Sequence, residues 1–218
     1  MKPVLFKLAG ISMIAFSLLS CKKIPDLKAR LNFEVNNIDT NSVSAKRELR
    51  FETFTLNLNT IEFSARKDEK DFAAVAENSS YLDLAQSSSF FSSISLAEGF
   101  YRGVHVKLEI KRSESAPSVF LKGTYSDEKG NSTPLEIYVN EPIDIDLPAE
   151  DLLVFGNRNY KGEINVDLDK LLSSIAIYDI AIAQKTNGVV MINSSSNINL
   201  YNKVKSAMKN SFVVKFAD

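Results

Sequence analysis

Two pairs of aspartates, each with its members two residues apart, are the groups in this sequence best suited to chemistry. Asp144 and Asp146 lie in an alternating apolar segment, and Asp167 and Asp169 lie in a second one. Side chains two residues apart on a strand share one face at a spacing of about 7 Å. If the two strands paired, four carboxylates could gather into an oxygen-rich Ca²⁺ site, and two could support glycoside hydrolysis. A plain solvated strand face, protected from aggregation by its charges, explains the same pattern without any site.

The other chemical groups are sparse. The chain has one histidine, His105, flanked by Val104 and Val106 in an alternating segment, so we expect a solvated histidine on the polar face of a strand. A catalytic histidine needs a nucleophile and an orienting acid, and no G-x-S-x-G motif is present to supply a serine. One histidine and one cysteine exclude H-E-x-x-H motifs, internal disulfides and multi-cysteine zinc sites. We therefore predict a protein that has no enzymatic activity and binds no cofactor, except that a Ca²⁺ ion remains possible at the aspartates.

Aromatic and basic residues offer two possible contact surfaces. The aromatic residues near a glycine-containing turn could stack on sugars or dock on a partner, or could simply close one end of the core: Phe90, Phe91, Phe100 and Tyr101. The basic residues near the N-terminus could touch anionic lipid headgroups, or could belong to a soluble tether: Lys22, Lys23, Lys28 and Arg30.

The single cysteine lies where a lipid anchor would need it. Lys2 and Lys7 precede an apolar run from Leu8 to Leu19, which is too short to cross a bilayer as a helix and is typical of a signal peptide. The run ends in Leu-Leu-Ser-Cys at residues 18–21, which resembles the lipobox of bacterial lipoproteins. The resemblance implies cleavage before Cys21 and acylation of its thiol and new amino group, which would attach the protein to a lipid bilayer. Lys22 in place of an aspartate favours the outer membrane of the cell envelope, with its face left open.

Length and charge bound the remaining chain. The sequence has 218 residues, with 26 Lys and Arg against 27 Asp and Glu. Removal of residues 1–20, which hold two lysines and no acid, changes the formal charge from −1 to −3. This balance gives no attraction to nucleic acid. We predict a signal peptide over 1–20, a tether over 21–30 and a single domain over 31–218.

Alternation with period two dominates the domain and predicts strands. The apolar phase changes between Phe51 and Phe54 and again between Leu58 and Ile61, which indicates bulges or bends in one long strand. A hairpin is predicted around 127–131, a strand over 175–182, a helical turn over 169–174, and a last strand over 212–216. A helix with its apolar face at Ile198, Tyr201, Val204 and Met208 is expected after an N-cap at Ser195 or Ser196. Because the spacers are too short for repeated crossover helices, we expect a mainly β, antiparallel sandwich with a short C-terminal helix.

Three stretches, taken in order, also resemble an uncharacterised family of bacterial lipoprotein β-sandwich domains. They are residues 56–63, residues 96–110, and the pair 143–147 and 164–169. The resemblance implies an immunoglobulin- or transthyretin-like sandwich, and more distantly a likeness to fimbrial subunits, but no activity. We therefore predict a membrane-anchored envelope lipoprotein that serves as an interaction or structural module. A carbohydrate- or calcium-binding module and a fimbrial or adhesin-type subunit are the alternatives.

Overall fold

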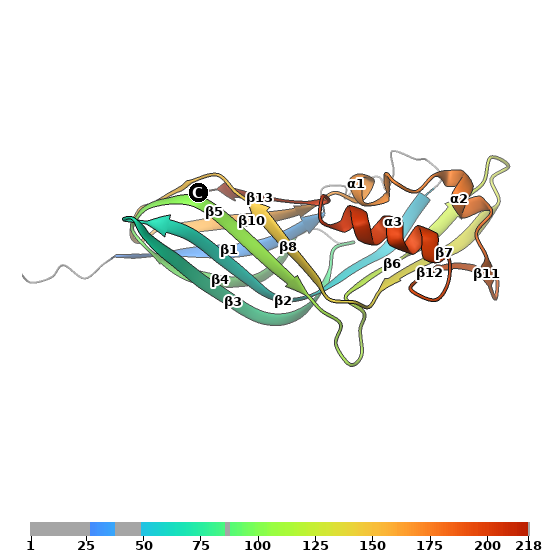
Figure 1. Cartoon of the computed structure of the whole chain (residues 1–218), viewed down its shortest axis with the longest axis horizontal. Helices are drawn as coiled ribbons and strands as arrows, with labels where there is room; N and C mark the ends of the chain where they lie inside the picture. Colours follow the sequence, from blue (N-terminus) through green and yellow to red (C-terminus); the bar gives the residue numbers. More distant parts are fainter. Residues whose placement is uncertain (1–26, 38–48, 86–87, 218) are drawn as a thin grey trace, which may run out of the picture.

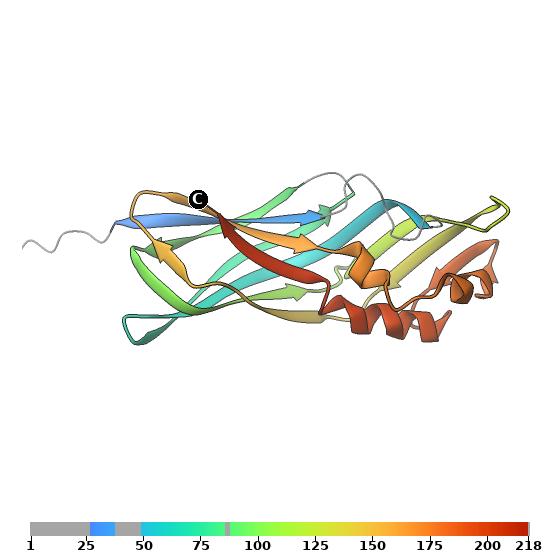
Figure 2. The same ribbon diagram turned by 90° about the horizontal axis from the view of Figure 1, so that it is seen from above.

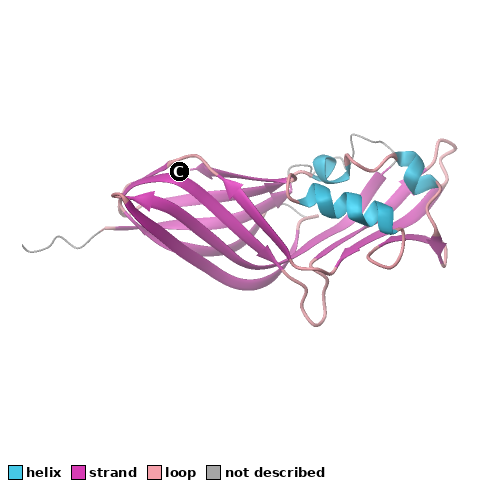
Figure 3. Ribbon diagram, in the orientation of Figure 1, coloured by secondary structure: helices cyan, strands magenta, loops and turns pink. Residues whose placement is uncertain are grey.

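Strands make up most of the computed structural model, which describes residues 27–37, 49–85 and 88–217 (Figures 1 and 3). They form two sheets. The four-stranded sheet has the order β13 (Phe212–Ala217), β10 (Asn159–Val166), β1 (Lys28–Asn37) and β4 (Ser89–Ala97). The nine-stranded sheet has the order β11 (Lys185–Thr186), β12 (Val189–Ile192), β7 (Ser132–Val139), β6 (Val119–Ser126), β2 (Leu49–Lys67), β5 (Gly99–Ile110) and β8 (Ile143–Pro148), with β3 (Lys70–Asp83) on β2 and β9 (Leu152–Val154) on β5.

Strand β2 links the two halves of the larger sheet. One edge of β2 pairs with β6 along the first half of the strand and with β5 along the second half. The other edge of β2 pairs with β3 along the second half. Asn57 lies where β5 gives way to β6, and its backbone bonds to Lys111 and Ser118 at the two ends of their connection. The sheet curls into a half-barrel around the apolar face of the smaller sheet, and contacts of β3 with β4 and of β8 with β13 bring the edges of the two sheets together.

The predicted phase changes in β2 are confirmed as bulges within one strand. Its pairing with β6 shifts register between Phe51 and Thr53, and its pairing with β3 and β5 shifts between Leu58 and Thr60. Against β6 and against β5, the shift places one extra residue on β2, so the apolar side chains return to the core face after it. Phe51, Phe54, Leu58 and Ile61 are consequently all buried despite their irregular spacing.

The prediction of mainly β structure is confirmed, but the prediction of purely antiparallel pairing is wrong, because both sheets are mixed. Strand β1 pairs in parallel with β10, and β7 pairs in parallel with β12. Short spacers exclude parallel pairing only between strands that are adjacent in sequence. These parallel partners are far apart in the chain, so the intervening strands and helices serve as the connection.

Three helices follow β10 at one end of the molecule: α1 (Leu168–Leu172), α2 (Ile177–Ala181) and α3 (Ile198–Met208). Helix α3 is confirmed, and Tyr201, Val204 and Met208 of its predicted apolar face are buried. Ile198, the first residue of that face, is instead 50% exposed, and the N-cap is Asn197 rather than a serine. The helical turn at 169–174 and the last strand are also confirmed. The predicted strand over 175–182 is wrong, since α2 occupies its centre. Ile177 and Ile180 are three residues apart, which places them on the same face of a helix. Ile180 is fully buried.

The molecule is elongated, and its two ends differ (Figures 1 and 2). Strand β1 begins at one end, inside the range predicted as tether, and α2 and β11 lie at the other end. Within the described residues, no helix is both long enough and apolar enough to span a bilayer.

Candidate functional site

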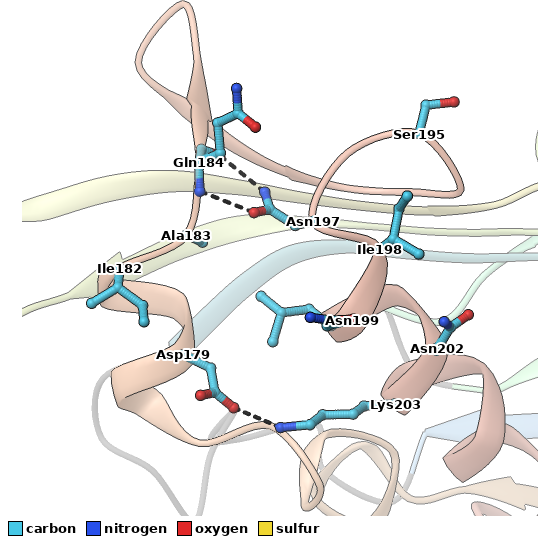
Figure 4. Close-up of a pocket in the computed structure, with 11 residues that line it drawn as sticks. Asp179, Ile182, Ala183, Gln184, Ser195, Asn197, Ile198, Asn199, Asn202 and Lys203 are labelled. Carbon is cyan, nitrogen blue, oxygen red and sulfur yellow. Dashed lines mark hydrogen bonds and ion pairs between the residues drawn. The ribbon is translucent and has the colours of Figure 1, made fainter.

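A groove lies between α2 and α3, at the end of the molecule opposite the start of β1 (Figures 1 and 4). It encloses about 880 Å³. One side is formed by the end of α2 and the residues up to Gln184, and the other by the first two turns of α3 with the loop before it. Leu200, which is buried, closes it toward the core.

Asn197 fixes the shape of this groove. It has a left-handed backbone, with φ 52° and ψ 47°, a conformation that asparagine tolerates better than most residues. Its side-chain Nδ2 donates to the carbonyls of Gln184 at 2.9 Å and Met191 at 2.8 Å, and its Oδ1 accepts from the Gln184 N–H at 2.9 Å. One amide therefore joins the segment after α2, strand β12 and the start of α3 (Figure 4).

Two further interactions hold the walls of the groove. The Asn193 side-chain Oδ1 accepts from the N–H groups of Ser195 and Ser196, each at 2.8 Å, which orders the loop before α3. Across the groove, Lys203 Nζ on α3 contacts Asp179 Oδ2 on α2 at 2.7 Å. Because this pair joins the two helices and balances its own charge, the groove combines a rigid frame with little net charge.

Apolar side chains project at the edge of the groove instead of packing inward. Ile182 and Ile198 line it and are 65% and 50% exposed, and Tyr178 on α2 is 70% exposed. Asn199 and Asn202 add side-chain amides to the lining of the groove. Large apolar residues that remain exposed beside a groove are typical of binding surfaces.

A second, shallower hollow continues the groove along the other side of α3. It shares Asn202 and Lys203 with the groove and reaches Lys170 and Ser173 at α1, with a volume of about 580 Å³. Most of its lining residues end in hydroxyl, amide and ammonium groups, but most of the surface they present to the hollow is apolar, as in the aliphatic part of a lysine side chain.

The four aspartates predicted as a possible metal site are not brought together. Asp144 and Asp146 lie on β8 in the larger sheet, whereas Asp167 and Asp169 follow β10 in the smaller sheet, so the pairing that a four-carboxylate site requires is absent. Asp167 is not on a strand face but is the N-cap of α1, where its Oδ1 accepts from the Lys170 N–H at 2.9 Å. Aspartate is a poor strand former and a good helix cap, which explains this outcome. Among the residues that the structure describes, no three His, Cys, Asp or Glu side chains are placed to hold a metal ion.

His105 lies on the outer face of β5, and its side chain is half exposed, as predicted. It has an acidic partner, since its Nδ1 is 3.0 Å from Asp146 Oδ1 on the neighbouring strand. Ser64 lies opposite His105 on β2, but no hydrogen bond joins their side chains in the described part of the chain. The pair faces open solvent on a sheet surface, which gives no enclosed place for a substrate.

The predicted aromatic cluster is divided between buried and exposed positions. Phe91 and Tyr101 are fully buried, while Phe90 and Phe100 are 57% and 41% exposed on the opposite faces of their strands. Phe90 also begins β4, whereas the glycine turn follows the end of that strand, so it lies far from Phe100. Burial raises the pKa of Tyr101, whose hydroxyl donates to the Ala97 carbonyl at 2.9 Å, so its role is structural.

Cys21, Lys22 and Lys23 lie outside the described residues, while Lys28 and Arg30 are exposed at the start of β1.

The groove was not predicted from the sequence. Asn197 before the helix, and Ile182 and Ile198 at the ends of helical segments, were the residues that could have indicated it. No protein-family model, curated protein or solved structure matches this chain.

Proposed function

We propose that this protein is a lipid-anchored component of a bacterial cell envelope, held to the membrane through acylated Cys21, and that its domain binds a protein partner without catalysing a reaction. The lipobox-like residues 18–21 and the position of the only cysteine support the anchor. The β-sandwich lipoprotein resemblance, with its immunoglobulin- or transthyretin-like architecture, remains part of this proposal.

The relation between the two ends of the domain is the observation that carries the proposal. The described chain begins beside β1 at one end, and the groove between α2 and α3 lies at the opposite end (Figures 1 and 2). A lipid attached through Cys21 would therefore hold the first end at the bilayer and direct the groove away from it. Such a geometry suits a module that presents a binding surface to another component of the envelope.

The exposed apolar side chains favour a protein as the partner. Ile182 and Ile198 line the groove from the end of α2 and the start of α3, and Tyr178 is exposed on α2, four residues before Ile182. Full burial of one isoleucine side chain stabilises a complex by about 1.5–3 kcal/mol, so a few such residues can dominate the free energy of binding.

Photo-crosslinking from the groove tests this function. A photoactivatable residue at Asn202, which is exposed in the groove, should crosslink one defined protein in intact cells. The substitution Ile198→Asp should abolish that crosslink, whereas Val75→Asp, at a side chain of similar exposure on β3, should leave it unchanged. Equal crosslinking in both variants would show that the groove is not the binding surface.

A glycan ligand is the second candidate, favoured by the amides of Asn199 and Asn202 in the groove and by the exposed ring of Tyr178 on α2, the helix whose end forms the opposite wall. Amides that donate and accept, next to an aromatic ring, match the hydroxyls and apolar faces of sugars. Binding to a glycan array that Tyr178→Ala abolishes would select this candidate over a protein partner. A fimbrial subunit would instead polymerise, and a strictly monomeric sedimentation profile would exclude it.

A further inference from the structure

Four large apolar side chains are exposed at the end of the domain where β1 begins. Phe100 and Leu153 are directly opposite each other in the pairing of β5 with β9, on the outward face of both strands. They are 41% and 50% exposed, and Phe155, just after β9, is 51% exposed. Leu27, just before β1, is 42% exposed, and a Cβ atom at Gly156 would lie 2.2 Å from its Cβ. These side chains therefore share one end of the molecule, since they come from adjoining turns.

Hydrogen bonds hold these turns together. The Glu98 N–H donates to the Leu27 carbonyl at 3.2 Å, and the Asn157 N–H donates to the Lys28 carbonyl at 3.2 Å. The start of β1 is thus fixed between the turn that precedes β5 and the turn that follows β9. The apolar side chains are exposed on a rigid base, which lowers the entropic cost of contact with another surface.

Basic side chains lie against two of the apolar ones. The guanidinium group of Arg102 lies over the Phe100 ring, 5.1 Å from its centre, and that of Arg158 lies over the Phe155 ring at 5.2 Å. Lys28, Arg30 and Arg158 line one hollow of about 470 Å³, with no carboxylate in its lining. None of these four basic side chains forms a salt bridge within the described residues.

The hydroxyl and amide groups of the same hollow complete a site for phosphate oxygens. Ser93 and Ser95 on β4 and Asn157 before β10 lie beside the basic residues, and the Arg30 Nε already donates to Ser93 Oγ at 2.8 Å. Guanidinium and ammonium groups with neighbouring hydroxyls are the donors that phosphate prefers. Glu98, Asp68 and Glu69 are exposed acids at this end, and none of them lines this hollow. Asp68 and Glu69 line a separate hollow with Phe100, Arg66 and Arg102, so the basic character is concentrated at Lys28, Arg30 and Arg158.

The distance to Cys21 identifies what would face this end. Leu27 follows Cys21 by six residues, which span at most about 22 Å when fully extended. An acylated Cys21 would therefore keep this end of the domain within reach of the headgroups. Exposed apolar side chains beside a cluster of arginine and lysine are the composition of surfaces that lie on anionic bilayers.

We propose that Leu27, Phe100, Leu153 and Phe155, with Lys28, Arg30, Arg102 and Arg158 around them, form a second membrane contact, here called the β1-end surface. Its apolar side chains enter the headgroup boundary, and its basic hollow binds phospholipid phosphates. The orientation of the domain, with the groove away from the bilayer, then follows from this contact as well as from the tether. This second contact adds to the proposed anchoring through Cys21, and in cells it depends on that anchor to bring the β1-end surface to the bilayer.

The absence of tryptophan from the chain permits a direct test of the apolar contact. The mature chain beginning at Cys21 is coupled through that single thiol to a maleimide lipid in vesicles containing anionic phospholipid. In this state Phe155→Trp should show blue-shifted emission that brominated phospholipid quenches. Tyr178→Trp, on α2 at the other end, should emit as in water and resist quenching. Water-like, unquenched emission from Phe155→Trp would overturn the proposal.

The basic hollow is tested with the same chain carrying Cys21→Ser, which has no lipid tether. Sedimentation with anionic vesicles measures its partition coefficient. Lys28→Gln, Arg30→Gln and Arg158→Gln together should weaken this partition by about 100-fold, since each basic residue near an anionic surface accounts for about five-fold. The control combines Lys129→Gln, Lys185→Gln and Lys209→Gln, exposed lysines elsewhere with the same change of charge, and should lose far less. Equal losses would reduce the effect to net charge and overturn the proposed hollow.

The two proposals fail in different ways. Coupling through a maleimide supplies a tether whether or not cells acylate Cys21, so the vesicle experiments judge the β1-end surface alone. The mass of Cys21 in protein taken from cells judges the anchor alone.

Discussion

Replacement of Asn197 tests how the candidate groove is held in shape. Its side chain makes three hydrogen bonds, of which the two to Gln184 are exposed and the one to Met191 is partly buried. Exposed bonds contribute about 0.5 kcal/mol each and a partly buried one about 1 kcal/mol, so their joint loss should lower the free energy of unfolding by about 2 kcal/mol. A left-handed backbone costs alanine about 1 kcal/mol more than it costs asparagine or glycine. We therefore expect Asn197→Gly to lose about 2 kcal/mol and Asn197→Ala about 3 kcal/mol.

Denaturant unfolding of the two variants measures this order, with Asn187 as the matched control. Asn187 has the same φ of 52° in an exposed turn, and its side chain makes no hydrogen bond within the described residues. Its glycine variant should match the native protein within about 0.5 kcal/mol, while its alanine variant should lose only the backbone term of about 1 kcal/mol. An Asn197→Gly variant as stable as the native protein would refute the proposed role of the side-chain amide. Equal stability of the glycine and alanine variants at position 197 would refute the proposed cost of placing alanine in a left-handed backbone.

Three further outcomes are expected. Burial and a hydrogen bond to Glu136 raise the pKa of Tyr138 to about 12, so the free energy of unfolding should stay level below pH 10 and fall between pH 10 and 12. Ultraviolet titration should show late-titrating tyrosines that include Tyr138 and Tyr101, and Glu136→Gln should shift the Tyr138 titration alone to lower pH. Gly123→Ala should lower stability by about 3 kcal/mol or more in thermal unfolding, because its Cβ would lie 2.0 Å from the Arg50 carbonyl oxygen where β2 and β6 approach; near-native stability would contradict this close approach. Millimolar Ca²⁺ should leave the melting temperature unchanged, because the two aspartate pairs lie in different sheets; a rise that saturates with Ca²⁺ would revive the metal site.

The strands of this protein were largely predictable because their signal is local. Alternating burial in β1, β5 and β8 follows from residues two apart, and even the bulges of β2 were visible as changes of phase. The parallel pairing of β1 with β10 was not predictable, because the sequence contains no local record of which distant strand lies alongside. Helix α2 was mistaken for a strand since five residues carry too little periodicity to separate a spacing of two from one of three.

The candidate site was less predictable than the fold. The groove depends on Asn197, whose bonds reach Gln184 and Met191, and on an ion pair between residues 179 and 203. Such contacts join segments that become neighbours only when α2 and α3 pack. Asp167 was assigned to a strand because it continues an alternating pattern of acidic and apolar residues, but the strand ends before it and Asp167 caps helix α1.

The mass of the N-terminal peptide from protein extracted from cell membranes tests the central claim most directly. We predict a chain that begins at Cys21 and carries one diacylglyceryl group on the thiol and one acyl chain on the amino group. The same protein should be found in the outer-membrane fraction. A chain that begins elsewhere, or an unmodified Cys21 thiol, would contradict the proposed anchor and the orientation derived from it.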